Sequence, residues 1–193
     1  MKKRFPLLQV LGFLLIALSL GILLAQRFLV TESIKKNAAI AQQIQALLPE
    51  PQYGTTADYS GSEMPVLQIE GADYVCLLEV PALSVHLPVQ NQWQAGILNT
   101  QPSRFWGSIY DGTLILGGGN QVGQFDFCAR LDIGDQIILT DMQGTEFHCS
   151  VAQIDRSSSA DFGKLSDEAY PLTLFVREEY DSRYIVVRCQ WGH

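Results

Sequence analysis

Basic residues are few in this sequence: 13 Lys and Arg stand against 20 Asp and Glu, which gives a formal net charge of −7. A protein that binds nucleic acid needs a basic stripe to neutralise phosphates. The composition therefore argues against a nucleic-acid partner. Internal repeats and low-complexity tracts are also absent, and the 193 residues suffice for one domain and an anchor.

Metal-binding motifs are absent as well. The four cysteines form no C-x-x-C pair, and the three histidines are too scattered for a zinc-site spacing; the cysteines are Cys76, Cys128, Cys149 and Cys189. We therefore expect no metal site and no cofactor. Because free cysteine is among the most buried residue types, we interpret these four as small apolar core residues. A disulfide outside the cytoplasm is an open alternative, but sequence alone does not pair the cysteines.

The N-terminus predicts a membrane anchor. A basic tail, residues 1–4, precedes an apolar run from Phe5 to Ala25, and a helix needs roughly 20 such residues to cross a bilayer core. A cleaved signal peptide has a shorter apolar region, and the end of this run is a poor cleavage site. We expect a single-pass protein of the cell membrane, with the basic N-terminus inside and the rest extracytoplasmic.

Residues 26–71 predict a helical stalk followed by a linker. Apolar residues recur at helical spacing from Thr31 to Leu48, and Pro49-Glu50-Pro51 should end that helix because proline lacks the N–H. A stretch rich in Gly, Ser and Thr follows, from Tyr53 to Pro65. The domain proper is expected at residues 72–193.

This domain has the pattern of a β protein, with short apolar runs separated by turn residues. We expect six clear strands, at Tyr74–Val80, Leu83–Val89, Thr113–Leu116, Gln136–Thr140, Glu146–Ile154 and Leu172–Val176, and a closing strand at Tyr184–Cys189. Asp141-Met142-Gln143-Gly144 should form a hairpin turn. A short helix or turn is expected at Phe125–Leu131, and one helical turn at Leu165–Glu168. Such a pattern suggests a barrel or a sandwich.

The order of motifs from Tyr74 to Trp191 resembles that of the sortases, most closely the class B-like enzymes of Firmicutes. The segments that carry the resemblance are Glu79-Val80-Pro81-Ala82-Leu83, Leu87-Pro88-Val89, Arg104-Phe105-Trp106-Gly107, Arg130-Leu131, Gly134-Asp135 and Val187-Arg188-Cys189. No segment is specific alone, but their order over more than a hundred residues is. The resemblance implies a mainly β fold, an eight-stranded sortase β-barrel with short helices, here preceded by a transmembrane helix.

Sortases use a cysteine nucleophile, a histidine and an arginine to cleave and transfer sorting signals of the L-P-x-T-G type. The family cysteine ends an active-site strand resembling Leu172–Arg177, so its position is Arg177 in this chain. The family histidine lies in I-A-G-H-N, which matches Leu116–Asn120 and puts Gly119 at the histidine position. The family arginine falls at Tyr184. A guanidinium is a permanent cation and cannot act as a nucleophile.

Displaced residues could in principle restore the chemistry. Arg183 is one residue from the arginine position, but a shift of one residue sends a side chain to the opposite face of a strand, so Arg183 would serve only through a bulge. His148 and Cys149 are adjacent on one strand and point to opposite faces, so they form no dyad.

We therefore expect a sortase-like protein without catalytic activity, which binds a sorting-signal-like peptide or an intact sortase through the former groove. Asn120, Arg177 and Tyr184 are the groove candidates. The alternative is an active cysteine transpeptidase with displaced residues that anchors surface proteins to the Gram-positive cell wall. A third possibility is a structural paralogue that binds nothing, which the sequence does not distinguish from the first.

Overall fold

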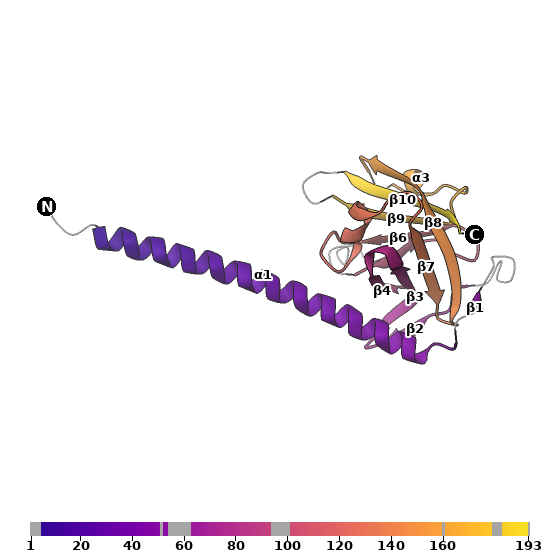
Figure 1. Ribbon diagram of the computed structural model, residues 1–193, viewed down its shortest axis with the longest axis horizontal. Helices are drawn as coiled ribbons and strands as arrows, with labels where there is room; N and C mark the ends of the chain where they lie inside the picture. Colours follow the sequence, from indigo (N-terminus) through magenta and orange to yellow (C-terminus); the bar gives the residue numbers. More distant parts are fainter. Residues whose placement is uncertain are drawn as a thin grey trace.

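The computed structural model describes residues 5–50, 52–53, 63–93, 101–159, 161–178 and 183–192, and it places a β-barrel at one end of a long helix (Figure 1). The expected cytoplasmic tail (residues 1–4), most of the expected linker and the C-terminal histidine lie outside the described residues.

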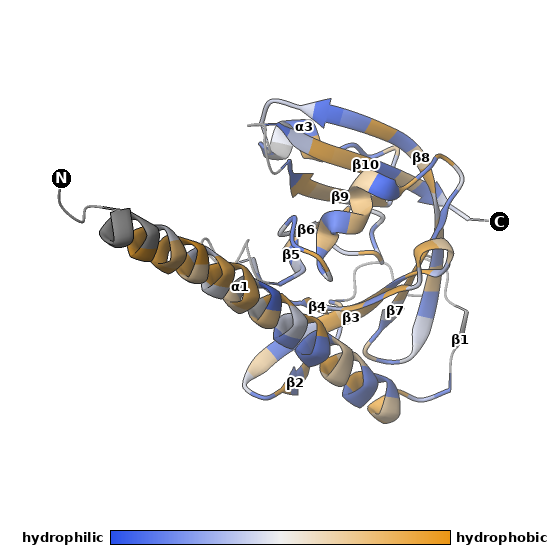
Figure 2. Ribbon diagram, turned by 60° about the vertical axis from the view of Figure 1, so that its left-hand side comes forward, coloured by the Kyte–Doolittle hydropathy of each residue, from blue (hydrophilic) through white to orange (hydrophobic). Residues whose placement is uncertain are grey.

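The N-terminal helix α1 runs without a break from Phe5 to Leu47, so the expected membrane segment and stalk form one helix of 43 residues. It is long and apolar enough to cross a membrane. At 1.5 Å per residue its length is about 65 Å, roughly twice the thickness of a bilayer core. Figure 2 shows the difference between its halves: after the first turns, which are grey, the first half is almost uniformly apolar, whereas the second alternates apolar and polar residues.

The second half of α1 packs on the barrel. Ile40, Ala41 and Ile44 are at most 2% exposed and form one cluster with Tyr74 and Leu77 of the barrel wall. Helix and barrel are therefore joined by a small hydrophobic core of their own. The stalk is a packed element rather than a free spacer.

In the part of the chain that the structure describes, ten strands pair into one sheet. They are β1 (Gln52–Tyr53), β2 (Leu67–Ile69), β3 (Ala72–Val80), β4 (Val85–Gln90), β5 (Ser103–Trp106), β6 (Leu114–Gly118), β7 (Gln136–Asp141), β8 (Thr145–Ser157), β9 (Leu172–Arg177) and β10 (Tyr184–Trp191). Strands β3 to β10 close a barrel in the order β3-β4-β5-β6-β9-β10-β8-β7, because β7 pairs with β3 as well as with β8. The expected eight-stranded barrel is confirmed, and the two shortest strands, β1 and β2, are additions to it.

The described residues also contain three short helices, which are η1 (Pro81–Leu83), η3 (Phe125–Arg130) and α3 (Phe162–Leu165). The helix predicted near Phe125 is confirmed. The helical turn predicted at Leu165–Glu168 is wrong, because the turn starts earlier: the carbonyl of Asp161 accepts hydrogen bonds from the N–H groups of Lys164 and Leu165.

Strand boundaries also differ from the prediction. Strand β4 begins only at Val85, because Pro81–Leu83 form η1 and Ser84 takes a left-handed conformation with φ of 52°. The sequence predicts that this strand ends before Gly117. Strand β6 instead continues through Gly117 and Gly118, because both residues pair with β9. Strand β5 was not predicted, since its four residues show no clear alternation.

Alternation along β9 and β10 separates two faces, as the sequence predicts. Leu172, Leu174 and Val176 point into the main core together with the alternate β10 residues Ile185, Val187 and Cys189. The opposite side chains form a second apolar cluster on the outside of the barrel, which we call the outer cluster; it contains Ile115, Leu165, Phe175 and Val186, with Trp93, Phe105 and Tyr184 packed against it. The outer cluster covers the face of β6, β9 and β10 on which the candidate site lies.

The predicted hairpin between β7 and β8 is held by a buried carboxylate. Asp141 accepts hydrogen bonds from the Tyr110 hydroxyl at 2.6 Å and from the backbone N–H groups of Gln143 and Thr145 at 2.8 and 2.9 Å. Gly144 takes φ of 82°, which the turn requires and which L side chains rarely adopt. Burial of Asp141 is tolerated because hydrogen bonds satisfy its oxygens.

Candidate functional site

The three positions that the sequence analysis predicts to match the sortase catalytic residues lie together at one end of the barrel. Strands β6 and β9 are parallel, with Gly118 opposite Val176, so the next residues, Gly119 and Arg177, are neighbours where both strands end. Strand β10 is antiparallel to β9 and places Tyr184 directly opposite Arg177. Residues far apart in the sequence are thus brought to a single corner.

Arg177 is exposed at this corner, as the last residue of β9. Within the described part of the chain no carboxylate pairs with it. The adjacent Glu178 instead accepts a hydrogen bond from Arg156 at 2.8 Å and lies 3.6 Å from the Nε of Arg183. Glu178 therefore leaves the Arg177 guanidinium available to solvent or to a ligand.

Tyr184 and Arg183 take different positions, as strand periodicity predicts. Tyr184 packs in the outer cluster, with its ring centroid 6.4 Å from that of Phe175. Arg183 precedes β10, is exposed, and its carbonyl accepts a hydrogen bond from the Glu178 N–H. Arg183 therefore contacts Glu178 next to the corner, while the Tyr184 ring covers the outer face of β9.

The loop after β6 connects this corner to helix α1. The Gly119 carbonyl accepts a hydrogen bond from the Phe125 N–H, which closes a turn containing the half-buried Asn120. In the same loop the Gly123 carbonyl accepts a hydrogen bond from Asn37 of α1 at 3.3 Å. Any side chain at Gly123 would collide with Ile34, since a Cβ there would lie 2.5 Å from its Cγ1. The corner is thus held against the second half of α1.

The four cysteines lie away from this corner, in the main core. Burial raises the pKa of the Cys149 thiol to about 12 and raises the pKa of the thiols of Cys76, Cys128 and Cys189 as well. Because the thiolate is the nucleophilic form, these protonated thiols have the character of inert core residues. The prediction that they are small buried core residues is confirmed.

The described histidines have other partners. His86 lies 3.3 Å from Glu79 across the β3–β4 pair, and His148 lies 3.1 Å from Glu146 on its own strand. His148 and the buried Cys149 occupy opposite faces of β8, since Cys149 belongs to the main core. Neither imidazole is paired with a thiol.

An aromatic group covers the outer face of β6 and β9 behind the corner. Trp93, Phe105 and Phe175 form a triangle with 5.3 Å between each pair of ring centroids. A Cβ at Gly117 would lie 2.4 Å from Trp93 and 2.5 Å from Phe175. Glycine at this position therefore lets both rings lie directly on the strand backbone. Sequence reasoning missed Trp93, because nothing in its neighbours indicates that it packs against a strand 24 residues later.

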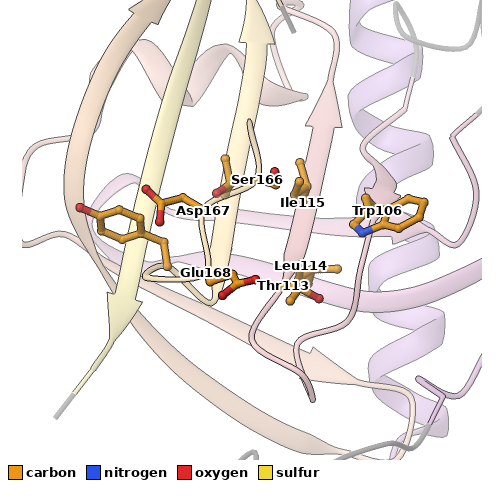
Figure 3. A pocket seen from close by; sticks show the side chains of 9 residues that line it. Trp106, Thr113, Leu114, Ile115, Ser166, Asp167 and Glu168 are labelled. Atoms are coloured by element: carbon orange, nitrogen blue, oxygen red, sulfur yellow. The ribbon is translucent and has the colours of Figure 1, made fainter. Parts of the chain in front are cut away.

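A pocket of about 420 Å³ opens on the same outer face, at the opposite ends of β6 and β9. Figure 3 shows Leu114 and Ile115 of β6 and the preceding Thr113 at its centre, Trp106 on one side, and Ser166, Asp167 and Glu168 on the other. Tyr170 and Thr173 complete the lining. Sequence reasoning did not identify this pocket, because its residues come from four separate segments.

Arg188 holds the wall of this pocket in place. Its guanidinium donates to the Asp155 carboxylate of β8 and, at 2.8 Å, to the carbonyl of Lys164 at the end of α3. At the other end of the same connection the Tyr170 hydroxyl donates to Gln153 at 3.0 Å. Both ends of the segment with Ser166, Asp167 and Glu168 are therefore attached to the barrel.

Comparison with known proteins identifies the fold. No family model and no curated protein sequence matches the chain. Among solved structures, sortase C1 from Streptococcus agalactiae is 18% identical with a TM-score of 0.56, over 72% of this chain and 75% of that one. A sortase D5 transpeptidase from Clostridium perfringens is 14% identical with a TM-score of 0.53, over 62% and 79%.

A third similar structure is sortase C from Clostridium perfringens with the C-terminal cell wall sorting motif. It is 18% identical with a TM-score of 0.52, over 85% of this chain and 88% of that one. Identities this low show the fold alone. The chain has the sortase fold, with an N-terminal helix that could anchor it in a membrane.

Proposed function

We propose that this protein is a membrane-anchored, extracytoplasmic sortase-like protein that has no transpeptidase activity and binds a peptide through the former active-site groove. The observation that carries the proposal is the chemistry of the corner where β6, β9 and β10 meet. Gly119, Arg177 and Tyr184 lie together there, and none of them supplies a thiol or an imidazole.

The chemical reason for inactivity is the lack of an activated nucleophile. Transpeptidation by a cysteine requires a thiolate within reach of a base. The four thiols are buried, and burial raises their pKa. His86 and His148 lie beside glutamates instead. These observations favour a degenerate sortase-like protein over an active enzyme with displaced residues. Its assignment as class B-like belongs to the proposal and comes from the order of motifs in the sequence.

Arg177 supports peptide binding at the same corner. Its guanidinium offers a planar fork of donors that suits a carboxylate or a peptide carbonyl. Gly119 beside it has no side chain to obstruct a ligand, and Tyr184 provides an aromatic wall. The similar Clostridium perfringens sortase C was solved with a cell wall sorting motif, which makes a peptide of that kind the first ligand to test. An intact sortase is the second partner to test.

The membrane topology in this proposal comes from α1 and the residues before it. Three basic residues precede the apolar helix, and such residues are retained on the cytoplasmic side. The barrel follows the helix and would therefore lie outside the cell.

The test uses the full-length chain in detergent, because truncation after α1 would expose the barrel surface that Ile40 and Ile44 cover. Fluorogenic L-P-x-T-G-like and N-P-x-T-N-like peptides should be neither cleaved nor transferred, whereas an active sortase in the same detergent should process them. Turnover that a Cys→Ser change at any of the four cysteines abolishes would overturn the proposal.

Binding of the same peptides is measured in parallel. Arg177→Ala should weaken it by about 10- to 150-fold, which corresponds to the roughly 1.5–3 kcal/mol of a hydrogen bond to a charged group. Arg183→Ala is the matched control, because Arg183 is an exposed neighbour that contacts Glu178. The melting temperature should barely move in either variant. If the wild type and Arg177→Ala bind the peptides equally well, then Arg177 does not contribute to peptide binding.

A further inference from the structure

The covered face of α1 begins close to its apolar half. Val30 and Ser33 are half-buried, and Asn37 and Ile40 are buried, which is the spacing of one helical face. By contrast, the large apolar side chains from Val10 to Leu24 are 52–74% exposed, and Figure 1 shows this part of α1 extending beyond the barrel. Only a few residues therefore separate the barrel from the apolar part of the helix.

The distance between the barrel and a bilayer follows from the rise of the helix. If the apolar run from Phe5 to Ala25 spans the hydrocarbon, Val30 lies about 8 Å and Ile34 about 14 Å beyond its end, at 1.5 Å per residue. The headgroup layer on each side of a bilayer is about 5–8 Å thick. Phe28, which is 66% exposed, continues the apolar segment past Arg27 and brings the barrel closer still. The helix thus leaves little room between the barrel and the headgroups.

The loop after β6 meets α1 at this level. A Cβ at Gly123 would lie 2.5 Å from Ile34 Cγ1, and the Gly123 carbonyl accepts a hydrogen bond from Asn37. These contacts lie about one to two turns closer to the apolar half than Ile40, the first α1 residue of the cluster that joins helix and barrel. Because α1 is continuous, they fix the height of the loop above the bilayer.

The tip of this loop suits the headgroup layer. Val122 precedes Gly123 and is 61% exposed. The loop residues Asn120–Gly123 carry no charge, so they enter the interface without the desolvation of an ion. Arg27 and Lys36 are exposed on α1 on either side of this level, where their side chains can reach lipid phosphates. A single exposed valine is ordinary on a surface in water, but the height of this one on α1 gives it a partner.

We propose that the loop Asn120–Gly123 is a lipid-contact surface, with Val122 in the headgroup layer of the bilayer that α1 spans. The Arg177 corner adjoins this loop through Gly119, so the contact holds the corner near the membrane surface. The inference rests on the proposed function in taking α1 as the membrane anchor. It is independent of peptide binding and of the lack of turnover.

The test uses the full-length chain in phosphatidylcholine vesicles, with an environment-sensitive fluorophore on a single introduced cysteine. The four native thiols are buried, so the wild type should take up no fluorophore. In Val122→Cys the emission should shift to the blue, and a nitroxide on the lipid headgroup should quench it.

Gln143→Cys is the matched control. Gln143 is an exposed turn residue beside Gly144, which meets Pro49 past the other end of α1. A fluorophore there should emit as it does in water, and headgroup quenching should be several-fold weaker than in Val122→Cys.

A second pair of variants tests the valine itself. With the fluorophore on Gln121→Cys, adding Val122→Asp should lower the headgroup quenching, because moving a carboxylate out of water is costly. Adding Val122→Ile should leave the quenching unchanged. Equal quenching in the two double variants would show that Val122 does not enter the headgroup layer.

A fluorophore on Leu20→Cys separates this inference from the proposed function. Quenching there by a nitroxide on the acyl chain would show that α1 lies in the bilayer, and without it the anchor and the inference both fail. If Leu20→Cys is quenched but Val122→Cys is not, only the inference fails. Blue-shifted but unquenched emission in Val122→Cys would mean that protein, such as a second copy of the chain, covers the loop, which would also overturn the inference.

Discussion

Gly117→Ala tests whether the aromatic triangle lies on the face of β6. An alanine Cβ would lie 2.4 Å from Trp93 Cζ3 and 2.5 and 2.7 Å from two carbons of the Phe175 ring. Carbon atoms in good contact are about 3.5–4.0 Å apart. Both rings would therefore have to move by about 1 Å, although each is packed against the other and against Phe105.

The expected loss of stability follows from two opposing effects. Overpacking a close-packed cluster costs about 1–3 kcal/mol. Replacing glycine inside a strand recovers roughly 0.5–1 kcal/mol of backbone entropy. We therefore expect Gly117→Ala to lower the free energy of unfolding by about 1–2 kcal/mol. In a Trp93→Ala background one of the two collisions is gone, so the same change should cost less, with a coupling of about 0.5–3 kcal/mol between contacting residues.

The assay is urea unfolding of the full-length chain in detergent, followed by tryptophan fluorescence. Gly163→Ala is the matched control, because a Cβ there meets no atom within 4 Å; it should be neutral or slightly stabilising. If Gly117→Ala is as stable as Gly163→Ala, or if Trp93→Ala leaves its cost unchanged, then Trp93 does not lie on Gly117.

Three further predictions concern the helix, the thiols and the topology. Ile44→Ala should destabilise the packing of α1 on the barrel by about 2–4 kcal/mol and expose that joint to trypsin, because Ile44 is fully buried, whereas Leu47→Ala, at a side chain 66% exposed, should not. Burial raises the pKa of the Cys149 thiol from its usual 9.0 to about 12, so this thiol ionises at a lower pH in the unfolded chain than in the folded one. It should therefore leave the free energy of unfolding unchanged below about pH 8 and lower it as the pH rises from 9 toward 12. Urea unfolding at a series of pH values measures this dependence. Protease added to intact protoplasts should digest the barrel, and protection of the barrel while an external control is digested would reverse the proposed orientation.

The sequence was sufficient where structure depends on local pattern. Hydropathy identified an apolar helix long enough to cross a membrane. Alternation separated the inner from the outer residues of β9 and β10, and the glycine in Asp141–Gly144 predicted the hairpin turn. Motif order predicted the eight-stranded sortase barrel, which the closed strand order confirms. Strand β5 escaped prediction because Ser103–Trp106 is short and is defined by pairing with β6 rather than by its own pattern.

The sequence by itself predicted which residue types stand at the positions that resemble the sortase catalytic residues, because motif spacing leaves that alignment little freedom. Only the tertiary structure decided what surrounds them. Parallel pairing of β6 with β9 brings Gly119 beside Arg177, packing places Trp93 over Gly117, and four separated segments enclose the acidic pocket. Periodicity describes which way a side chain points, but contacts between residues distant in the chain depend on how the strands pair and how the side chains fill the remaining volume.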